Sequence, residues 1–288
     1  MSQVSPVERP GDASEITPDG VPVTNARDTR VLIGWAAPLV LLMALLGIWE
    51  AWVRIADKPA WFLPAPSRIG RTLWDERSLL LENGWVTLQE VLVGLGVAIV
   101  AGVAMAVVIH ASPIFERAVY PLVIASQAIP VVALAPLLLI WFGHGLLPKV
   151  IMTALIAFFP LTVATTDGLK SADRETLDLL RAMGASGVQR FRFVQAPNAM
   201  PAFFSGLKVA VAVAVIGAVI GEFVGSDSGL GHTIILANAS LRTDLVFACV
   251  AVLSMMAIGL FGLVSVIERV ALPWRRFQVG EAERRKGG

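Results

Sequence analysis

The sequence holds few of the residues from which catalytic and metal sites are usually built. Its 288 residues include one cysteine and three histidines. The single Cys249 excludes a disulfide framework within the chain, and the histidines stand far apart, without metal-ligand spacing. The P-loop, HExxH, CxxC and GxSxG patterns are also absent. We therefore predict no catalytic residue, no metal site and no cofactor bound by this chain.

Charge is equally scarce. Charged residues make up 16% of the chain and hydrophobic residues 56%, whereas soluble domains average about 25% charged and about 45–50% apolar residues. This composition predicts an integral membrane protein in contact with lipid. The net charge of +1 gives no indication of a nucleic-acid partner. Residues 1–30 are polar and lack an apolar h-region, so we expect no secretory signal peptide there.

Long apolar stretches are what the sequence has in abundance. Six of them can each cross about 30 Å of hydrocarbon as a helix, which predicts an all-α membrane protein. An even number of spans places both termini on one side, and basic residues are more numerous on that side, which indicates cytoplasmic termini. The basic residues of the first external loop point the other way. The predicted spans are Val31–Trp49, Val91–Ile109, Ala118–Gly143, Val150–Thr166, Ala202–Phe223 and Leu245–Ile267.

Some spans carry features beyond simple hydrophobicity. The second is bounded by Glu90 and His110, which we expect at the membrane surfaces. The third is interrupted by Pro121, Pro130 and Pro136. Prolines at membrane depth leave carbonyls without a helical partner, and this is tolerated where protein or a water-filled cavity satisfies them.

The fifth span is unusual because it must include Lys208, which we expect to snorkel to one face. Gly217 and Gly221 form a GxxxG pattern that permits close helix packing. Glu222 is the one acid predicted near the interior of a span, close to its outer end. Because a proton-coupled pump needs an intramembrane relay, this predicts a pathway whose energy comes from another protein.

The longest polar interruption is the segment 172–201. Its apolar residues recur at helical spacing on both sides of Gly184, which predicts two short helices. Ser186 and Gln189 form a capping-box pattern at the start of the second helix. Pro197 and Pro201 are expected to end it. The segment is therefore a candidate docking site for a partner protein that supplies energy. Packing of the segment on neighbouring helices of the same chain would give the same pattern.

This segment resembles the EAA loop of ABC importer permeases, the inner-membrane components of binding-protein-dependent transport. Asp178-Leu179-Leu180 stands at the EAA position, followed by Gly184 and then by Val194-Gln195-Ala196-Pro197 at the family's spacing. The departures are Asp for Glu, two leucines for alanines, Val for Ile and Ala for Leu. Stretches 127–145 and 221–239 are similar to permeases for sulfonates, taurine, nitrate, and riboflavin or thiamine precursors.

The resemblance implies a type I importer permease fold with six transmembrane helices and a cytoplasmic two-helix coupling loop. It further implies a permease homodimer in the bacterial inner membrane, two ATPase subunits that bind ATP and magnesium, and an external solute-binding protein. Accordingly, we expect a disordered cytoplasmic tail at 1–30, a first transmembrane helix with an external segment at 31–83, the permease domain at 84–274 and a basic cytoplasmic tail at 275–288.

Candidate functional residues follow from the same resemblance. Pathway candidates are Gln127, Pro130, Pro136 and Glu222, whose alternatives are an interhelical hydrogen bond, structural kinks and an interface-facing acid, respectively. Asp178 and Arg181 are expected to pair with charges of the ATPase. The candidate residues for ATPase coupling are Leu177, Asp178, Leu180, Arg181, Gly184, Ala185, Ser186, Phe191 and Pro197.

Two other classes of protein compete with the importer permease. A stand-alone secondary carrier or channel predicts ion-coupling acids within the spans and duplicated halves. A membrane-embedded enzyme predicts a catalytic cluster at one depth. Neither pattern is found in the sequence. The transported solute is left open between a neutral heterocyclic nutrient and a small anion.

Overall fold

The structure is a computed structural model that describes residues 26–57, 59 and 61–273, and within these every regular element is helical. The chain forms two compact units, 1–58 and 59–288. Helix α1 (Ala26–Ile55) belongs to the first unit and contains the first predicted span. It begins inside the predicted tail 1–30, whose other residues lie outside the described ones. The predicted basic tail 275–288 also lies outside them.

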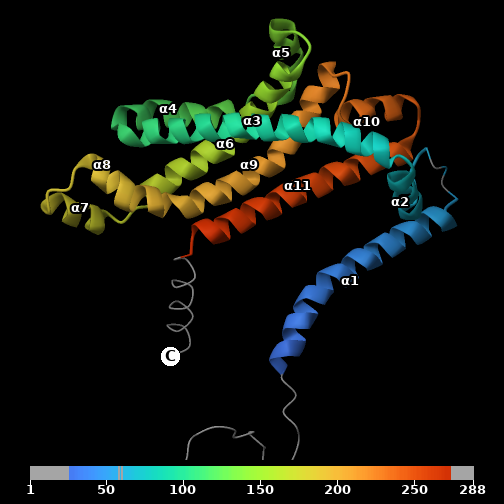
Figure 1. Ribbon diagram of the computed structural model, residues 1–288, viewed down its shortest axis with the longest axis horizontal. Coiled ribbons are helices and arrows are strands. Elements are labelled where there is room, and N and C mark those ends of the chain that lie inside the picture. The colour runs from blue at the N-terminus through green and yellow to red at the C-terminus, as the bar shows by residue number, and fades with distance from the viewer. Residues whose placement is uncertain (1–25, 58, 60, 274–288) are drawn as a thin grey trace, which may run out of the picture. The chain divides into compact units, whose positions relative to one another are not determined.

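The second unit is a bundle in which α3, α6, α9 and α11 run alongside one another (Figure 1). The short helices α7 and α8 lie at one end of the bundle, and α2 and α10 lie at the other. Its elements are α2 (Pro66–Asp75), α3 (Arg77–Ala111), α4 (Pro113–Ser126), the 3-10 helix η1 (Val131–Leu134), α5 (Ala135–Phe142), α6 (Leu146–Lys170), α7 (Arg174–Ala182), α8 (Gly187–Arg190), the π-helix η2 (Phe191–Gln195), α9 (Ala196–Gly225), α10 (Leu230–Ala239) and α11 (Thr243–Ala271).

The all-α membrane fold is confirmed. Among the described residues, four helical runs are long and apolar enough to cross a membrane, namely α3, α6, α8 through α9, and α11. They correspond to the second, fourth, fifth and sixth predicted spans. The third predicted span is a bent pair, α4 with residues 131–142, whose two parts meet at 85°. Counting this pair as one span gives five in the described residues.

Glycines bring α6 and α9 into close contact. A Cβ added at Gly206 would lie 2.5 Å from Cβ of Ala164, and one at Gly217 would lie 2.9 Å from Cα of Thr153. A Cβ at Gly221 would lie 3.1 Å from Cα of Lys149. The predicted close packing through Gly217 and Gly221 is therefore confirmed, and α6 is the helix that approaches them. Such small-residue contacts are the usual basis of helix packing in membranes.

The bend between α4 and α5 follows from its prolines. Pro130 caps the 3-10 helix and lacks the N–H that would continue a helix from α4. The residue before a proline is also disfavoured in the α conformation. Pro136 then occupies the first turn of α5, where its missing N–H costs little. The sequence therefore stops one helix and starts another within a few residues.

The bundle buries charged side chains that the sequence places at the membrane surface. Helix α3 begins at Arg77, so Glu90 lies far inside it and is 1% exposed. Lys149 lies inside α6 and donates from Nζ to Oε1 of Glu90 over 2.7 Å. The sequence places Glu90 at the edge of a span and does not predict that it pairs with Lys149. Each charge is buried because the other helix supplies its partner.

Lys208 of α9 likewise has a partner inside the protein. Its Nζ lies 2.5 Å from Oε2 of Glu268 in α11 and 5.6 Å from the ring centroid of Phe261. This acidic partner on the neighbouring helix is not predicted by the sequence. The prediction that Glu222 is the one acid near a span's interior is wrong, since Glu90 and Glu268 are buried as well.

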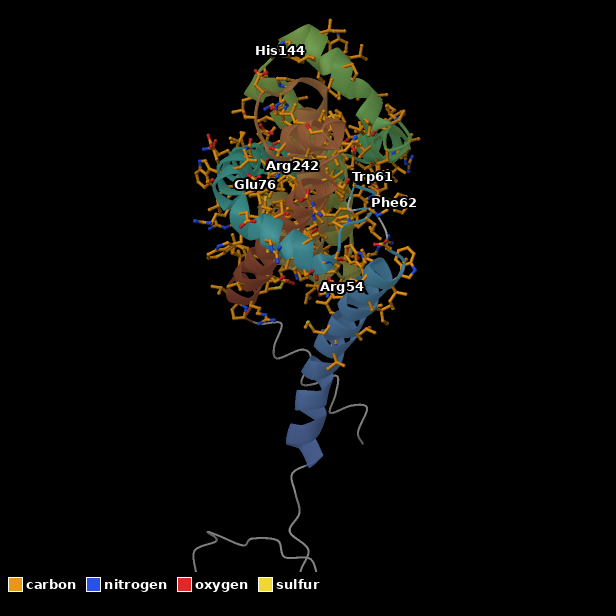
Figure 2. The ribbon with its side chains drawn as sticks, turned by 90° about the vertical axis from the view of Figure 1, so that its right-hand side faces the viewer. Arg54, Trp61, Phe62, Glu76, His144 and Arg242 are labelled. Atoms are coloured by element: carbon orange, nitrogen blue, oxygen red, sulfur yellow. The ribbon has the colours of Figure 1, made fainter. Side chains whose placement is uncertain are left out.

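The end of the bundle that carries α2 is held by contacts with the start of α11. Arg242 forms an ion pair of 2.6 Å with Glu76, and Figure 2 shows the two side chains close together. This hydrogen bond raises the pKa of Arg242. Thr72 also donates to Asp244 over 3.3 Å. Trp61 and Phe62, labelled in the same view, form an edge-to-face pair that precedes α2.

We predict that Gly206→Leu destabilises the folded protein, whereas Gly96→Leu does not. The new side chain at residue 206 would overlap α6, and overpacking of this kind costs about 1–3 kcal/mol. Gly96 is the matched control because no atom lies within 4 Å of a Cβ added there. Thermal unfolding midpoints of the purified protein in detergent measure the difference. Equal midpoints for the two variants would contradict the close α6–α9 contact.

The buried ion pair generates a second stability prediction. Lys149→Met leaves the Glu90 carboxylate buried without its cation, which costs about 3–5 kcal/mol. The double variant Lys149→Met with Glu90→Gln should recover most of this loss. Lys170→Met breaks an exposed pair with Glu116 and should cost far less stability, because solvent screens exposed charges. If the unfolding midpoints of Lys149→Met and Lys170→Met in detergent are equal, the pair between Lys149 and Glu90 does not contribute as a buried pair would.

Candidate functional site

Helix α7, the first helix of the polar segment 172–201, is capped by the side chain of Asp173, the residue that precedes it. The carboxylate of Asp173 accepts from the backbone N–H of Glu175 at 3.3 Å and of Thr176 at 3.1 Å. It also accepts from the Thr176 hydroxyl at 2.7 Å. These bonds satisfy N–H groups that have no partner within the helix. They lower the pKa of Asp173, the Thr176 hydroxyl being the largest cause.

A tight joint connects α7 to α8. Gly184 adopts φ +82°, a left-handed conformation that glycine reaches without strain. The N–H of Gly184 bonds to the carbonyl of Arg181, and the N–H of Ala185 bonds to that of Leu180. This is a Schellman motif, which satisfies the last carbonyls of α7. The predicted capping box is also present, because Ser186 N donates to Gln189 and Gln189 N donates to the Ser186 side chain.

The second short helix does not end at the prolines, and this part of the sequence prediction is wrong. Helical structure continues from Gly187 to Gly225 through α8, η2 and α9. Pro197 lies in the first turn of α9, directly after the π turn, where the missing N–H is tolerated. In the π turn the N–H of Ala196 bonds to the carbonyl of Phe191. The segment is thus joined to a membrane span without a loop.

The base of the segment is fastened to α4 and α9. Tyr120 donates to Asp167 near the end of α6 over 2.7 Å. Lys170, the last residue of α6, pairs with Glu116 over 3.0 Å and lies 4.1 Å from the Tyr120 ring centroid. On the other side, Asn198 of α9 donates to Ser171 over 2.9 Å. The two helices therefore project from a fixed base.

The apolar residues of the segment differ in exposure, although exposed Val188 and half-buried Leu177 and Phe191 line the same hollow. Leu179, Met183 and Val188 are 62%, 73% and 76% exposed, respectively. Leu177 and Phe191 are half-buried and line a hollow of about 530 Å³ between the segment and the end of α3. The outward apolar surface therefore differs from the set in the sequence prediction, which included Leu177 and Phe191.

Helix α7 carries an ion pair between two of its own residues. Asp178 and Arg181 form an ion pair of 2.8 Å, one turn apart on α7, and both are exposed. An exposed pair of this kind contributes little to stability. Its partners are therefore free to exchange for charges of another protein. Leu180 and Ala185 are half-buried at the joint, whereas Ser186 is exposed.

The pathway candidates fall into two places. Gln127 ends α4, Pro130 precedes the 3-10 helix and Pro136 begins α5, and all three are exposed on the bent segment. Glu222 is 1% exposed and lies inside α9. The structure brings the first three together on one segment and separates Glu222 from the exposed surface.

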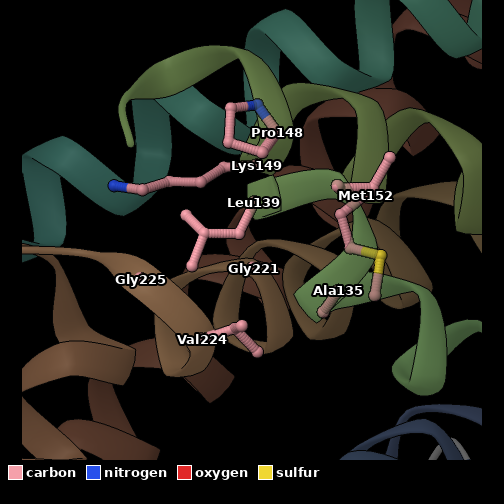
Figure 3. Close-up of a pocket in the computed structure, with 9 residues that line it drawn as sticks. Ala135, Leu139, Pro148, Lys149, Met152, Gly221, Val224 and Gly225 are labelled. Carbon is pink, nitrogen blue, oxygen red and sulfur yellow. The ribbon is translucent and has the colours of Figure 1, made fainter. Parts of the chain in front are cut away.

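A small cavity lies where α5, α6 and α9 meet. Figure 3 shows Leu139, Met152 and Val224 around it, with the Lys149 amino group directed away from Met152. Its volume is about 10 Å³, which is room for roughly one water molecule. This cavity is too small to hold a nutrient.

Glu222 belongs to a buried polar cluster formed by Thr87, Glu90, Lys149, Glu222 and Ser226. Glu222 Oε1 accepts from the Thr87 hydroxyl over 2.6 Å, and Oε2 accepts from the N–H of Gly231. Lys149 donates to Ser226 Oγ over 2.5 Å as well as to Glu90. The interpretation of Glu222 as an interface-facing acid is wrong, because both carboxylate oxygens have donors inside the protein.

Sequence reasoning missed Thr87, Glu90 and Lys149 as members of one cluster. Glu90 and Lys149 each stand at the edge of an apolar stretch, where a charge is expected at the interface. The signal available was the helical pattern upstream of Glu90, which places that residue inside a longer helix.

Among the described residues, no group of three or more His, Cys, Asp and Glu side chains is arranged to hold a metal ion.

Comparison with known proteins places this geometry in a family. Residues 98–272 match the family described as "Binding-protein-dependent transport system inner membrane component". The chain is 39% identical to the formylaminopyrimidine transport permease ThiX of Halalkalibacterium halodurans, over 84% of this chain and 96% of that protein. It is 37% identical to the riboflavin transport permease RibX of Chloroflexus aurantiacus, over 82% and 88%, respectively.

The fold is shared with a solved transporter. A chain of the inward-facing MetNI methionine ABC transporter superposes with a TM-score of 0.60 at 20% identity, over 68% of this chain and 97% of that chain. The buried acids remove one argument against a stand-alone carrier, and the family match decides between the two. The chain therefore belongs to the inner-membrane components of binding-protein-dependent transport systems, as a transmembrane permease subunit of an ABC importer whose ATP is hydrolysed by a separate subunit.

Proposed function

We propose that the segment 172–201 docks on the ATPase subunit and transmits its closure to the membrane helices. The carrying observation is the exposed apolar surface of Leu179, Met183 and Val188 on an element capped at both of its short helices. Apolar side chains on a rigid element are effective anchors at interfaces, because little conformational entropy is lost on binding. The exposed pair Asp178–Arg181 lies on the same helix and supplies charges for a partner.

Individual residues have distinct roles in this proposal. Gly184 and Ala185 form the joint that fixes the angle between the two helices, and Ser186 caps the second. Phe191 packs against the core cluster of Ala106, Leu169 and Ala199. Leu177 and Leu180 are half-buried anchors of the same segment, and Pro197 begins the span that receives the motion. ATP and magnesium bind the partner ATPase.

The solute pathway is proposed to lie at the bent segment of two permease copies. Gln127, Pro130 and Pro136 are exposed there on the single chain. Exposed side chains and breaks in helix hydrogen bonding occur at membrane depth where they line a cavity. A homodimer would provide such a cavity between the bent segments of its two copies. Glu222 is not assigned to the lining, since it is buried.

The orientation follows from the coupling proposal. If an ATPase docks at 172–201, that end of the bundle is cytoplasmic, and α2 and α10 face the external solute-binding protein. In a bacterial inner membrane, with six spans, both termini are then cytoplasmic. We retain 84–274 as the permease domain, with 31–83 as the first helix and external segment. The tails 1–30 and 275–288 are assigned to the cytoplasm.

The solute is proposed to be a heterocyclic nutrient of the pyrimidine or flavin type. The support is the similarity to ThiX and RibX over most of their length, together with a chain that has few charged residues. A sulfonate, taurine or nitrate is the competing class.

Docking predicts that Gly184→Glu reduces the amount of ATPase that co-purifies with the permease. The change strains a left-handed joint by about 1–2 kcal/mol and adds a charge to the docking surface. A loss of about tenfold or more in affinity corresponds to 1.4 kcal/mol. Gly143→Glu is the matched control, because Gly143 is also exposed and left-handed at φ +71° but lies between α5 and α6. Equal ATPase recovery for both variants would refute the coupling role.

The solute proposal predicts the ligand spectrum of the solute-binding protein that serves this permease. Its thermal midpoint should rise with formylaminopyrimidine or riboflavin, because a ligand that binds only the folded state stabilises it by RT ln(1 + L/Kd), where L is the concentration of free ligand. Taurine, an alkyl sulfonate and nitrate serve as controls and should leave the midpoint unchanged. A shift with one of these anions and none with the heterocycles would reverse the assignment.

A further inference from the structure

A continuous helical run connects the coupling helices with the buried polar cluster. It begins at Gly187 in the segment 172–201 and ends at Gly225, three residues beyond Glu222. Helix α9 alone is about 45 Å long at 1.5 Å per residue. Figure 1 shows α7 and α8 at one end of the bundle and α10 at the other. A displacement of the coupling helices is therefore delivered to the neighbourhood of Glu222 without passing through a loop.

At that far end, side chains of α3 and α9 hold the start of α10. The N–H of Gly229 donates to Oδ1 of Asn83 over 2.8 Å, and the N–H of Leu230 donates to the Thr87 hydroxyl over 2.9 Å. The N–H of Gly231 donates to Glu222. These are backbone groups of the first turn, which have no partner within the helix. A carboxylate at a helix N-terminus is also favoured by the helix dipole.

The glycines of α10 fit this arrangement. A Cβ at Gly229 would overlap Oε1 of Glu222, and a Cβ at Gly231 would lie 2.7 Å from Oε2. Gly229 also has φ +108°, which favours glycine independently of space. The carboxylate therefore sits directly against the backbone of α10. A side chain at either glycine would push α10 away from α9.

The turn before α10 is fastened as well. Lys149 of α6 donates to Ser226 Oγ, which in turn donates to the carbonyl of Ser228. Because Lys149 also pairs with Glu90 of α3, the cluster joins four helices at one buried point. Burial of these charges favours the assembled arrangement, since separating them would leave unpaired groups in a low-dielectric interior.

We propose that Glu222 is a positioning residue that makes α10 move together with α9 when the coupling helices are displaced. Helix α10 is then the element at the external end that the ATPase drives. This inference rests on the proposed function, since it requires that an ATPase moves the segment 172–201. To the proposed function it adds that α10 is the external helix that moves, and that Glu222 connects α10 to α9.

The test uses the permease assembled with its co-purified ATPase in lipid nanodiscs. Cys249, a buried residue, is first changed to Ala. Leu236→Cys then provides a reporter on α10, where the native side chain is 55% exposed. Its labelling rate with a water-soluble maleimide is compared without nucleotide and with ATP, magnesium and vanadate. Leu179→Cys, in a separate sample, reports whether the ATPase covers α7.

With the native cluster, trapping with vanadate should change the labelling rate of Leu236→Cys. Glu222→Gln keeps the size of the side chain but offers one acceptor oxygen where two donors are present, so this change in rate should be lost while ATP hydrolysis continues. Gly231→Ala places a Cβ 2.7 Å from Oε2 of Glu222, which breaks the same connection from the side of α10 and should have the same effect. Lys208→Met breaks a pair between α9 and α11 outside the cluster and should retain the rate change.

The remaining outcomes distinguish a failure of the role proposed for Glu222 from a failure of the coupling proposal. If Glu222→Gln fails to assemble, Gly231→Ala gives the result. If both variants keep the full nucleotide response, or if Lys208→Met loses it equally, the proposed role of Glu222 is wrong. If α7 is covered by the ATPase but α10 never responds, α10 is not driven, and the proposed function stands. If the ATPase leaves Leu179→Cys unprotected, the coupling proposal itself fails.

Discussion

The close contact between α6 and α9 is the constraint on which the bundle depends. Glycines of α9 at Gly206, Gly217 and Gly221 leave no room for a side chain facing α6. Backbones this close gain dispersion contacts along much of their length, which is the main attraction available between helices in lipid. The same contact brings Lys149 of α6 beside the α9–α10 turn. A looser pair would separate that lysine from its partners.

Buried charges give the bundle a specificity that apolar packing alone does not supply. Lys149 with Glu90 and Lys208 with Glu268 each join two helices that are far apart in sequence. Such pairs add little net stability compared with well-packed apolar residues. Each does penalise a rotation or slide of one helix, because a displaced charge would be left without a partner. The two pairs therefore fix the rotation of α3, α6, α9 and α11 about their axes.

The sequence was sufficient for the features that depend on local signals. Long apolar runs predicted the spans, Gly184 predicted the break between α7 and α8, and Ser186 with Gln189 predicted the cap. The sequence was insufficient where the position of a side chain depends on a partner far away in the chain. Glu90 and Lys149 are separated by two predicted spans, so nothing local shows that each neutralises the other. Pro197 was taken to end a helix because the π turn before it, which accommodates the ring, has no sequence signature.

That π turn at Phe191–Gln195 sets the phase of the two surfaces it connects. An α-helix advances by about 100° per residue, and a π turn holds one additional residue within an otherwise α-helical run. Side chains of α8 are therefore rotated relative to the positions that an unbroken helix would give them. The single inserted residue thus determines the direction in which Val188 points relative to the glycines packed on α6. A change of one residue in the length of this turn would change that direction.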